Sequence, residues 1–243
     1  MDKQIYSKLR EVEDDHWWFV GRRSIVKRVL GLLDLPRMPS VLDAGCGTGG
    51  TLPMLSGLGK VVGLELDDGA AKVAITRHAG KLCRGGLPHD MPFSEQTFDL
   101  IVLLDVLEHI DDDLSAMMTV RNLLRPNGYL ILTVPAFPFL WGQLDEESHH
   151  KRRYQASSLA RLIQEAGLQA EYITFFNTLL FPAATLVRLA SRLIPPNEIA
   201  SDLRLPRPWL NKILQAIFSS ERHFMGWARL PFGVSLLAIV RRT

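Results

Sequence analysis

Cysteine is scarce in this chain: Cys46 and Cys83 are the two among 243 residues. Two cysteines are too few for a disulfide framework, and their separation lacks the short spacing of metal-ligand motifs. The sequence therefore argues against a disulfide-stabilised secreted domain and against a cysteine metal site. We expect the protein to reside in a reducing cytoplasm.

Long apolar stretches are missing as well. Residues 1–6 lack the apolar segment of a secretory signal. An uncharged, largely apolar run, 172–187, contains Asn177 and Pro182 and is shorter than the roughly 20 apolar residues of a spanning helix. We expect neither a signal peptide nor a transmembrane segment. Internal repeats and low-complexity tracts are also lacking, and the length suits one large core, or one core with an appended module.

The charge is nearly balanced overall, with a net value of +2, but it is unevenly distributed. Residues 177–243 carry nine lysines and arginines against three acids, so the preceding part is slightly acidic. Because charge patterning reports on partners rather than on fold, the basic C-terminal part is expected to serve a second role.

From Ser40 onward, short apolar runs alternate with helical patterns. The runs are continuous rather than alternating, as in strands that are buried on both faces of a parallel sheet. This rhythm predicts a doubly wound α/β domain. The predicted strands are 41–42, 61–64, 98–104 and 129–134, and the predicted helices between them include 111–124 and 157–166.

The rhythm breaks after Tyr172. Two amphipathic helices are predicted at 181–194 and 209–218, separated by a proline-rich linker, before strand character returns at 233–240. The simplest topology inserts a helical element before the last strand, which then closes the same sheet. The predicted organisation is an N-terminal helical lid (1–38), a cofactor-binding core (39–176), a helical insertion (177–230) and a final strand (231–243).

The strongest motif is the segment VLDAGCGTGG at 41–50, in which a buried strand runs into a glycine-rich turn and then a helix. Gly45, Gly47 and Gly50 fit the dinucleotide pattern G-x-G-x-x-G, so the glycines alone do not identify the ligand. Such a turn lies at the carboxyl end of the first strand, where open α/β sheets bind ligands.

Charge around the turn discriminates between cofactors. Asp43 precedes the turn, Asp105 and Glu108 follow a strand at the same sheet edge, and neither lysine nor arginine occurs between Leu42 and Ser56. These acids would repel the pyrophosphate of a nicotinamide dinucleotide and attract the sulfonium and ammonium of S-adenosylmethionine (AdoMet). The sequence therefore predicts AdoMet as the cofactor.

Two further residues near the turn have predicted roles. Glu65 ends the second strand about 20 residues past the loop, where an acid can accept the ribose hydroxyl hydrogens; the alternative is a solvated acid before a helix. Cys46 is expected to border the cofactor as a small loop residue rather than to act as a nucleophile, since the sequence places no base near it.

Taken in order, these segments resemble the class I AdoMet-dependent methyltransferases. The resemblance covers about 42–172 and is strongest to ubiquinone-biosynthesis O-methyltransferases and to bacterial methyltransferases associated with surface-glycan synthesis. Each motif alone is weak, but the ordered set is specific. The motifs are DAGCGTG (43–49), GLE (63–65), LPHDMPF (87–93), FDLI (98–101) and DVLEH (105–109).

The resemblance implies a seven-stranded Rossmann-like sheet whose last strand is antiparallel. Where the family often has an acid after the third strand, this chain has Gly85-Gly86-Leu87, so adenine contact there is expected from the backbone and the Leu87 side chain. The implied cofactor contacts are Asp43, Gly45, Gly47, Glu65, Leu66, Gly86, Leu87 and Asp105.

An aromatic cluster, HWWF at 16–19, precedes Arg22 and Arg23 near the N-terminus. One interpretation is an amphipathic helix that packs its aromatic side chains on the sheet. The other is a lid over the cofactor, with Arg22 or Arg23 pairing the methionine carboxylate. The segment also resembles the N-terminal cap of related methyltransferases.

Methylation of a hydroxyl needs a base, or a metal that lowers the hydroxyl pKa. His149 and His150 lie in the segment 145–154 after the fifth strand, which is either a binding loop that carries the base or a charged surface loop. A histidine before Arg-Arg-Tyr in the glycan-associated group favours His150. Asp105, Glu108 and His109 resemble the metal ligands of some ubiquinone-type enzymes, but we expect no metal, since carboxylate clusters alone do not define a site.

The helical insertion has two interpretations, a cap folded onto the catalytic domain or, over 177–224, an interfacial element that touches an anionic membrane or an isoprenoid-phosphate substrate. Its basic residues interleave with aliphatic ones, so no nucleic acid is expected. The predicted function is AdoMet-dependent methylation, on oxygen, of a small-molecule or lipid-linked acceptor. The alternatives are a non-catalytic AdoMet-binding subunit at a membrane-associated assembly and an NAD-dependent oxidoreductase.

Overall fold

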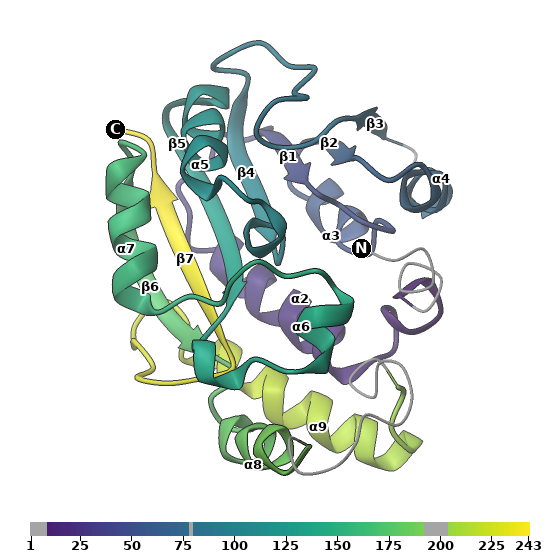
Figure 1. Ribbon diagram of the computed structural model, residues 1–243. Helices are drawn as coiled ribbons and strands as arrows, with labels where there is room; N and C mark the ends of the chain where they lie inside the picture. The colour runs from purple at the N-terminus through teal and green to yellow at the C-terminus, as the bar shows by residue number, and fades with distance from the viewer. Residues whose placement is uncertain (1–8, 78–79, 192–203) are drawn as a thin grey trace.

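The computed structural model describes residues 9–77, 80–191 and 204–243, and a seven-stranded sheet runs through its centre (Figure 1). The strand order is β3-β2-β1-β4-β5-β7-β6. Strands β1 to β5 are parallel to one another, whereas β7 is antiparallel to both of its neighbours, β5 and β6. The predicted sheet with an antiparallel last strand is therefore confirmed. The strands are β1 Ser40–Ala44, β2 Lys60–Glu65, β3 Lys81–Arg84, β4 Phe98–Leu104, β5 Leu124–Pro135, β6 Gln169–Phe176 and β7 Ser235–Arg241.

The central strands are continuously apolar because both faces of the sheet are buried. Along β4, Ile101 and Leu103 pack into one hydrophobic core, while Leu100 and Val102 pack into a second core on the opposite face. Successive side chains of a strand point to opposite faces, so two cores require apolar residues at every position. Strand β3 is short and partly exposed, and neither β3 nor β6 was among the strands predicted by residue range.

Helices cover both faces of the sheet, and their ends follow local signals. The helix predicted at 111–124 begins at Asp113, because the Asp112 side chain accepts a hydrogen bond from the Ser115 N–H at 2.9 Å and caps it. Pro208 begins α9 at a position where its missing N–H costs nothing. The helices are α2 Trp17–Leu30, α3 Leu52–Ser56, α4 Asp68–Arg77, α5 Asp113–Leu123, α6 Gln143–Glu147, α7 Ala156–Glu165, α8 Phe181–Ser191 and α9 Pro208–Ser220. The end of the helix predicted at 181–194 lies outside the described residues.

The insertion between β6 and β7 supplies α8 and α9, which lie at the lower end of the molecule in Figure 1. Helix α9 packs on α2, where the Phe218 ring stacks on Trp18 with centroids 5.2 Å apart. Asn211 of α9 accepts a hydrogen bond from the Trp17 N–H at 2.9 Å and donates to the Asp15 carbonyl at 2.8 Å. Trp17 and Trp18 therefore pack against the insertion, although both also line the main cavity of the molecule.

Helix α8 is much more exposed than α9. Leu186, Val187 and Leu189 are each more than two fifths exposed. Within the described part of the chain, no helix has both the length and the apolar character needed to cross a membrane.

Candidate active site

A cavity of about 1010 Å³ opens at the carboxyl ends of β1, β2 and β4. Its walls come from the N-terminal segment, the glycine turn after β1, the loops after β4 and β5, and the insertion. Ligand pockets in proteins commonly measure about 300–1,000 Å³, so this cavity has room for a cofactor and a second molecule.

The glycine turn approaches β2 closely. The N–H groups of Gly45 and Cys46 both donate to the Leu64 carbonyl, at 2.8 and 3.0 Å. Gly45 has a φ of +77°, and a Cβ there would come within 2.6 Å of the Val106 side chain. Glycine is therefore required at this position both by backbone conformation and by space.

Asp43, at the end of β1, is a buried carboxylate that lines the cavity. Its side chain is 2% exposed, and within the described structure its Oδ2 atom has no hydrogen-bond partner. Burial raises its pKa to about 7, against the opposing charge of Arg22. An unpaired buried carboxylate is costly, so this end of the cavity favours a cationic ligand.

Glu65 is held in one orientation by the backbone. Its Oε2 accepts from the Gly47 N–H at 2.8 Å, and its Oε1 accepts from Leu66 and Asp67, both at 2.9 Å. Burial nevertheless raises its pKa above the ordinary value, because it outweighs these hydrogen bonds. Oε1 already accepts two hydrogen bonds, whereas Oε2 keeps a second lone pair that can accept a hydroxyl hydrogen from a ligand.

The other predicted cofactor residues lie around the same end of the cavity. Leu66, Gly86 and Leu87 line it beyond Glu65. Cys46 also lines it, and burial raises the pKa of its thiol, with the charges of Asp43 and Glu65 adding to the effect. A thiol held in its protonated form is a poor nucleophile.

The two N-terminal arginines take different positions. Arg22 lines the cavity and forms an ion pair with Asp105, whose Oδ1 also accepts from the Thr133 hydroxyl at 3.1 Å. Arg23 instead donates to the backbone carbonyl of Glu13 at 2.7 Å and lies outside the cavity lining. The structure thus leaves Arg22 as the candidate for ligand contact.

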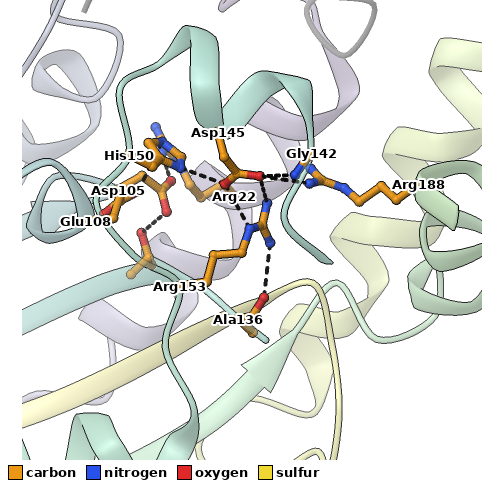
Figure 2. Close-up of polar contacts among 10 residues, drawn as sticks. Arg22, Asp105, Glu108, Ala136, Gly142, Asp145, His150, Arg153 and Arg188 are labelled. Atoms are coloured by element: carbon orange, nitrogen blue, oxygen red, sulfur yellow. Dashed lines mark hydrogen bonds and ion pairs between the residues drawn. The ribbon is translucent and has the colours of Figure 1, made fainter. Parts of the chain in front are cut away.

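A buried carboxylate in α6, Asp145, connects side chains that line the cavity (Figure 2). Its side chain is inaccessible and accepts two hydrogen bonds from Arg153, at 2.8 and 2.9 Å, and one from Arg188 at 3.3 Å. His150 Nδ1 lies 2.8 Å from Asp145 Oδ1. Burial acts to raise the Asp145 pKa, but the hydrogen bonds from His150 and Arg153 hold it below its ordinary value.

His149 and His150 are adjacent in sequence, but their side chains lie in different surroundings. His150 lines the cavity, and its Nε2 lies 4.0 Å from Glu108 Oε1. His149 has a φ of +56° and an exposed side chain that does not reach the cavity lining. Of the two predicted candidates, the geometry places His150 alone beside the ligand space.

The alternative metal ligands Asp105, Glu108 and His109 do not form one cluster. The Asp105 carboxylate instead pairs with Arg22 and accepts a hydrogen bond from the Thr133 hydroxyl. Glu108, His109 and His150 instead offer ligand atoms within 4.8 Å of one another.

Burial shifts the pKa values of two residues of this cluster, Glu108 and His109. Both oxygens of the Glu108 carboxylate are buried without a hydrogen-bond partner among the described residues, and burial together with the Asp105 charge raises the Glu108 pKa. Burial lowers the His109 pKa to about 4, and His150 adds to the shift. Glu108 and His109 therefore favour their neutral forms unless a bound cation compensates the charge of Glu108.

Several site residues were not found from the sequence. Glu13 accepts a hydrogen bond from the Thr48 hydroxyl and pairs with Arg77, so it fastens the N-terminal segment over the glycine turn. Asp145 in α6 and Arg188 in α8 are 43 positions apart in sequence. The charged run around Asp145 was a visible signal, but nothing local connects it to α8.

Comparisons with known proteins agree with this geometry. A family model described as "Methyltransferase domain" matches residues 17–173. The protein named "Probable S-adenosylmethionine-dependent methyltransferase" from Mycolicibacterium smegmatis is 27% identical over 161 residues, which cover 65% of this chain and 62% of that protein. A ubiquinone biosynthesis O-methyltransferase from Thiobacillus denitrificans is 27% identical over 157 residues, which cover 55% of this chain and 66% of that protein. The chain thus spans just under two thirds of the length of both relatives.

Solved structures share the fold at low identity. The methyltransferase in complex with the Trm112 methyltransferase activator of Haloferax volcanii superposes with a TM-score of 0.65 at 16% identity, covering 98% of this chain and 94% of that chain. A geranyl diphosphate methyltransferase in complex with AdoMet gives 0.61 at 15% identity, covering 92% and 85%.

We predict that Asp145→Asn lowers the free energy of unfolding by about 3–5 kcal/mol, because it leaves Arg153 buried without its counter-charge. Urea denaturation measures the loss. Since the Asp145 pKa is depressed, the stability it contributes is present above the ordinary value of 3.8 and is lost as the pH falls below it. The exposed neighbour variant Glu146→Gln should stay within about 0.5 kcal/mol of the parent. Equal stability of the two variants would contradict the assigned network.

Proposed function

The chain belongs to the methyltransferase domain family, and on that premise we propose that it transfers the methyl group of AdoMet to a hydroxyl oxygen of a small-molecule or lipid-linked acceptor. The observation that carries the proposal is the pairing of His150 with buried Asp145 on the wall of a cavity that Asp43 and Glu65 also line.

The residues at the glycine turn fit the cofactor. Asp43 supplies a buried carboxylate that lacks a partner at Oδ2 in the described structure, and Glu65 is oriented with one lone pair of Oε2 left to accept from a ribose hydroxyl. The segment between Leu42 and Ser56 has no basic side chain to bind a pyrophosphate, which disfavours a nicotinamide dinucleotide. When bound, AdoMet supplies a methyl group on a sulfonium, which is a good leaving group.

Arg22 is placed to bind the methionine carboxylate. Its guanidinium already pairs with one carboxylate, Asp105, at the cavity wall. A second carboxylate on the same fork would form charge-assisted hydrogen bonds without moving the helix that carries Arg22.

His150 fits the role of general base. Its Nδ1 faces the ionised Asp145, which fixes the proton on Nδ1 and leaves the Nε2 lone pair toward the cavity. Nε2 of His150 would accept the hydroxyl proton of an acceptor whose oxygen takes up the methyl group that bound AdoMet would supply, with the sulfonium sulfur as leaving group. The remaining work of the site is to hold the two reactants in line.

The names of the relatives support an oxygen acceptor. One is named for ubiquinone biosynthesis and O-methylation, and another, from Serratia marcescens, is a malonyl-[acyl-carrier protein] O-methyltransferase. A non-catalytic AdoMet-binding subunit is less well supported, because such a subunit has no need of the His150–Asp145 pair.

We predict that AdoMet binds about 5–10-fold more tightly near pH 7.5 than near pH 6, with release of a proton. The cationic ligand favours the ionised form of Asp43, whose pKa lies at about 7 without it. Titration calorimetry in buffers of different ionisation enthalpy measures both quantities. Asp43→Asn should bind weakly with a flat pH profile, whereas the exposed control Asp34→Asn should behave as the parent. A pH-independent affinity in the parent would exclude this role for Asp43.

Arg22→Ala should weaken AdoMet binding by about 10-fold or more, because it removes a charge-assisted contact to the carboxylate. Binding of methylthioadenosine, which has no amino acid portion, should change little. Calorimetry with both ligands separates loss of this contact from a general disturbance of the cavity. Equal losses for the two ligands would argue against the assigned contact.

His150→Ala should lower turnover by about 100–10,000-fold while AdoMet still binds, because the hydroxyl proton has no acceptor. His149→Ala, the adjacent exposed residue, should keep activity within about 3-fold. Release of S-adenosylhomocysteine across a panel of phenols, catechols and polyprenyl-linked glycans measures turnover. Full activity of His150→Ala would remove the proposed base.

The same assay tests the two alternative interpretations of the site, a metal site and a non-catalytic AdoMet-binding subunit. Loss of turnover with a chelator and recovery with magnesium would assign Glu108, His109 and His150 to a metal instead. Tight AdoMet binding without turnover on any acceptor would favour the non-catalytic subunit.

A further inference from the structure

The described part of the insertion, 177–191 and 204–230, has a one-sided charge. It contains six lysines and arginines and a single acid, Glu221. The Glu221 side chain is fully buried, where its Oε1 accepts from the Leu179 N–H at 2.8 Å. Every charged side chain that this part of the insertion presents to solvent is therefore basic.

The same part of the molecule exposes large apolar side chains next to those basic groups. The exposed fraction is 68% for Leu186, 64% for Val187 and 59% for Trp209. Isolated exposed apolar residues are normal, but several on two neighbouring elements mark an interaction surface. We call this the insertion surface, defined by Leu186, Val187, Leu189, Leu205, Trp209 and Ile213 with the basic residues Arg204, Arg207 and Lys212.

Both elements of the insertion surface contribute residues to the lining of the active-site cavity. Ala183 and Val187 of α8 line the cavity, as do Arg204 and Pro206 before α9. A partner that covers this surface therefore lies beside the cavity that His150 also lines.

We propose that the insertion surface docks on an anionic lipid bilayer, parallel to the membrane plane. Apolar side chains and an exposed tryptophan enter the boundary between headgroups and acyl chains, while arginine and lysine bind the anionic headgroups. Each basic residue near such a surface strengthens binding, and the acidic remainder of the chain is repelled, which orients the molecule. A second copy of the chain is a poorer occupant, because two surfaces with only basic exposed charges repel each other.

Docking gives the cavity access to acceptors that reside in the bilayer, a consequence that rests on the proposed function. The docking itself does not, because none of its contacts involves Asp43, Glu65 or His150.

Flotation with vesicles tests the proposal. The parent chain should float with vesicles that contain about one third phosphatidylglycerol and not with pure phosphatidylcholine, and raising the salt should weaken binding. Arg207→Gln with Lys212→Gln should reduce partitioning by about 10-fold or more. Lys72→Gln with Arg161→Gln, which removes the same charge from exposed positions on α4 and α7, should have a much smaller effect.

A second pair of substitutions tests the apolar contribution. Leu186→Ser with Trp209→Ser should remove the part of the binding that survives high salt. Absence of flotation, equal binding to neutral and anionic vesicles, or equal losses in the two charge variants would overturn the proposal. A concentration-dependent dimer in sedimentation that disappears in Leu186→Ser with Trp209→Ser would also overturn it. AdoMet affinity in solution is measured on the same samples, so failure of docking is distinguished from failure of the methyltransferase assignment.

Discussion

The buried carboxylate of Asp145 is the interaction on which the second half of the site depends. It joins three segments that the sheet alone would leave apart: its own helix α6, the loop of His150 and Arg153, and helix α8 through Arg188. The Asp145 carboxylate can stay ionised in this buried position because it is paired with cationic groups and hydrogen-bonded to them. The same pairing sets the orientation of the imidazole, so stability and chemistry rest on one group.

The charged groups that line the cavity differ in kind. Asp43 and Glu65 are acids beside the glycine turn, Glu108 and His109 are buried groups whose shifted pKa values favour their neutral forms, and Arg22 and Arg204 are basic. A cationic cofactor is therefore favoured beside Asp43 and Glu65. These two acids stand at the carboxyl ends of β1 and β2, where the sheet fixes their positions.

The sheet and the glycine turn were predictable because their signals are local. Continuous apolar strands, a turn that requires glycine at position 45, and an acid at the end of the second strand are all visible in a short window. Strand β3 is partly exposed and lacks such a pattern. The choice between Arg22 and Arg23 was also out of reach, since neighbouring residues on a helix differ by about 100° in direction, and only the packing of α2 decides which one faces the cavity.

The partners of Asp145 were out of reach for a different reason. Arg188 approaches it only after β6 and α8 have folded back across the cavity, and no periodicity relates the two positions. His109 and Glu108 stood in a recognisable motif, yet the third member of their cluster, His150, comes from the loop after β5. Local patterns identify what each segment is, whereas long-range packing decides which segments share a site.

The hydrogen bonds of Asn211 determine whether the insertion can be removed from the catalytic core. This one side chain of α9 fastens to residues 15 and 17, which precede and begin α2, and the Phe218 ring fills the space beside Gly21 on the same helix. Although the insertion interrupts the catalytic fold in sequence, it is part of the scaffold that positions the N-terminal segment. Excising it to obtain a minimal catalytic fragment would unfasten the wall that carries Arg22, so the insertion and the core form one inseparable unit.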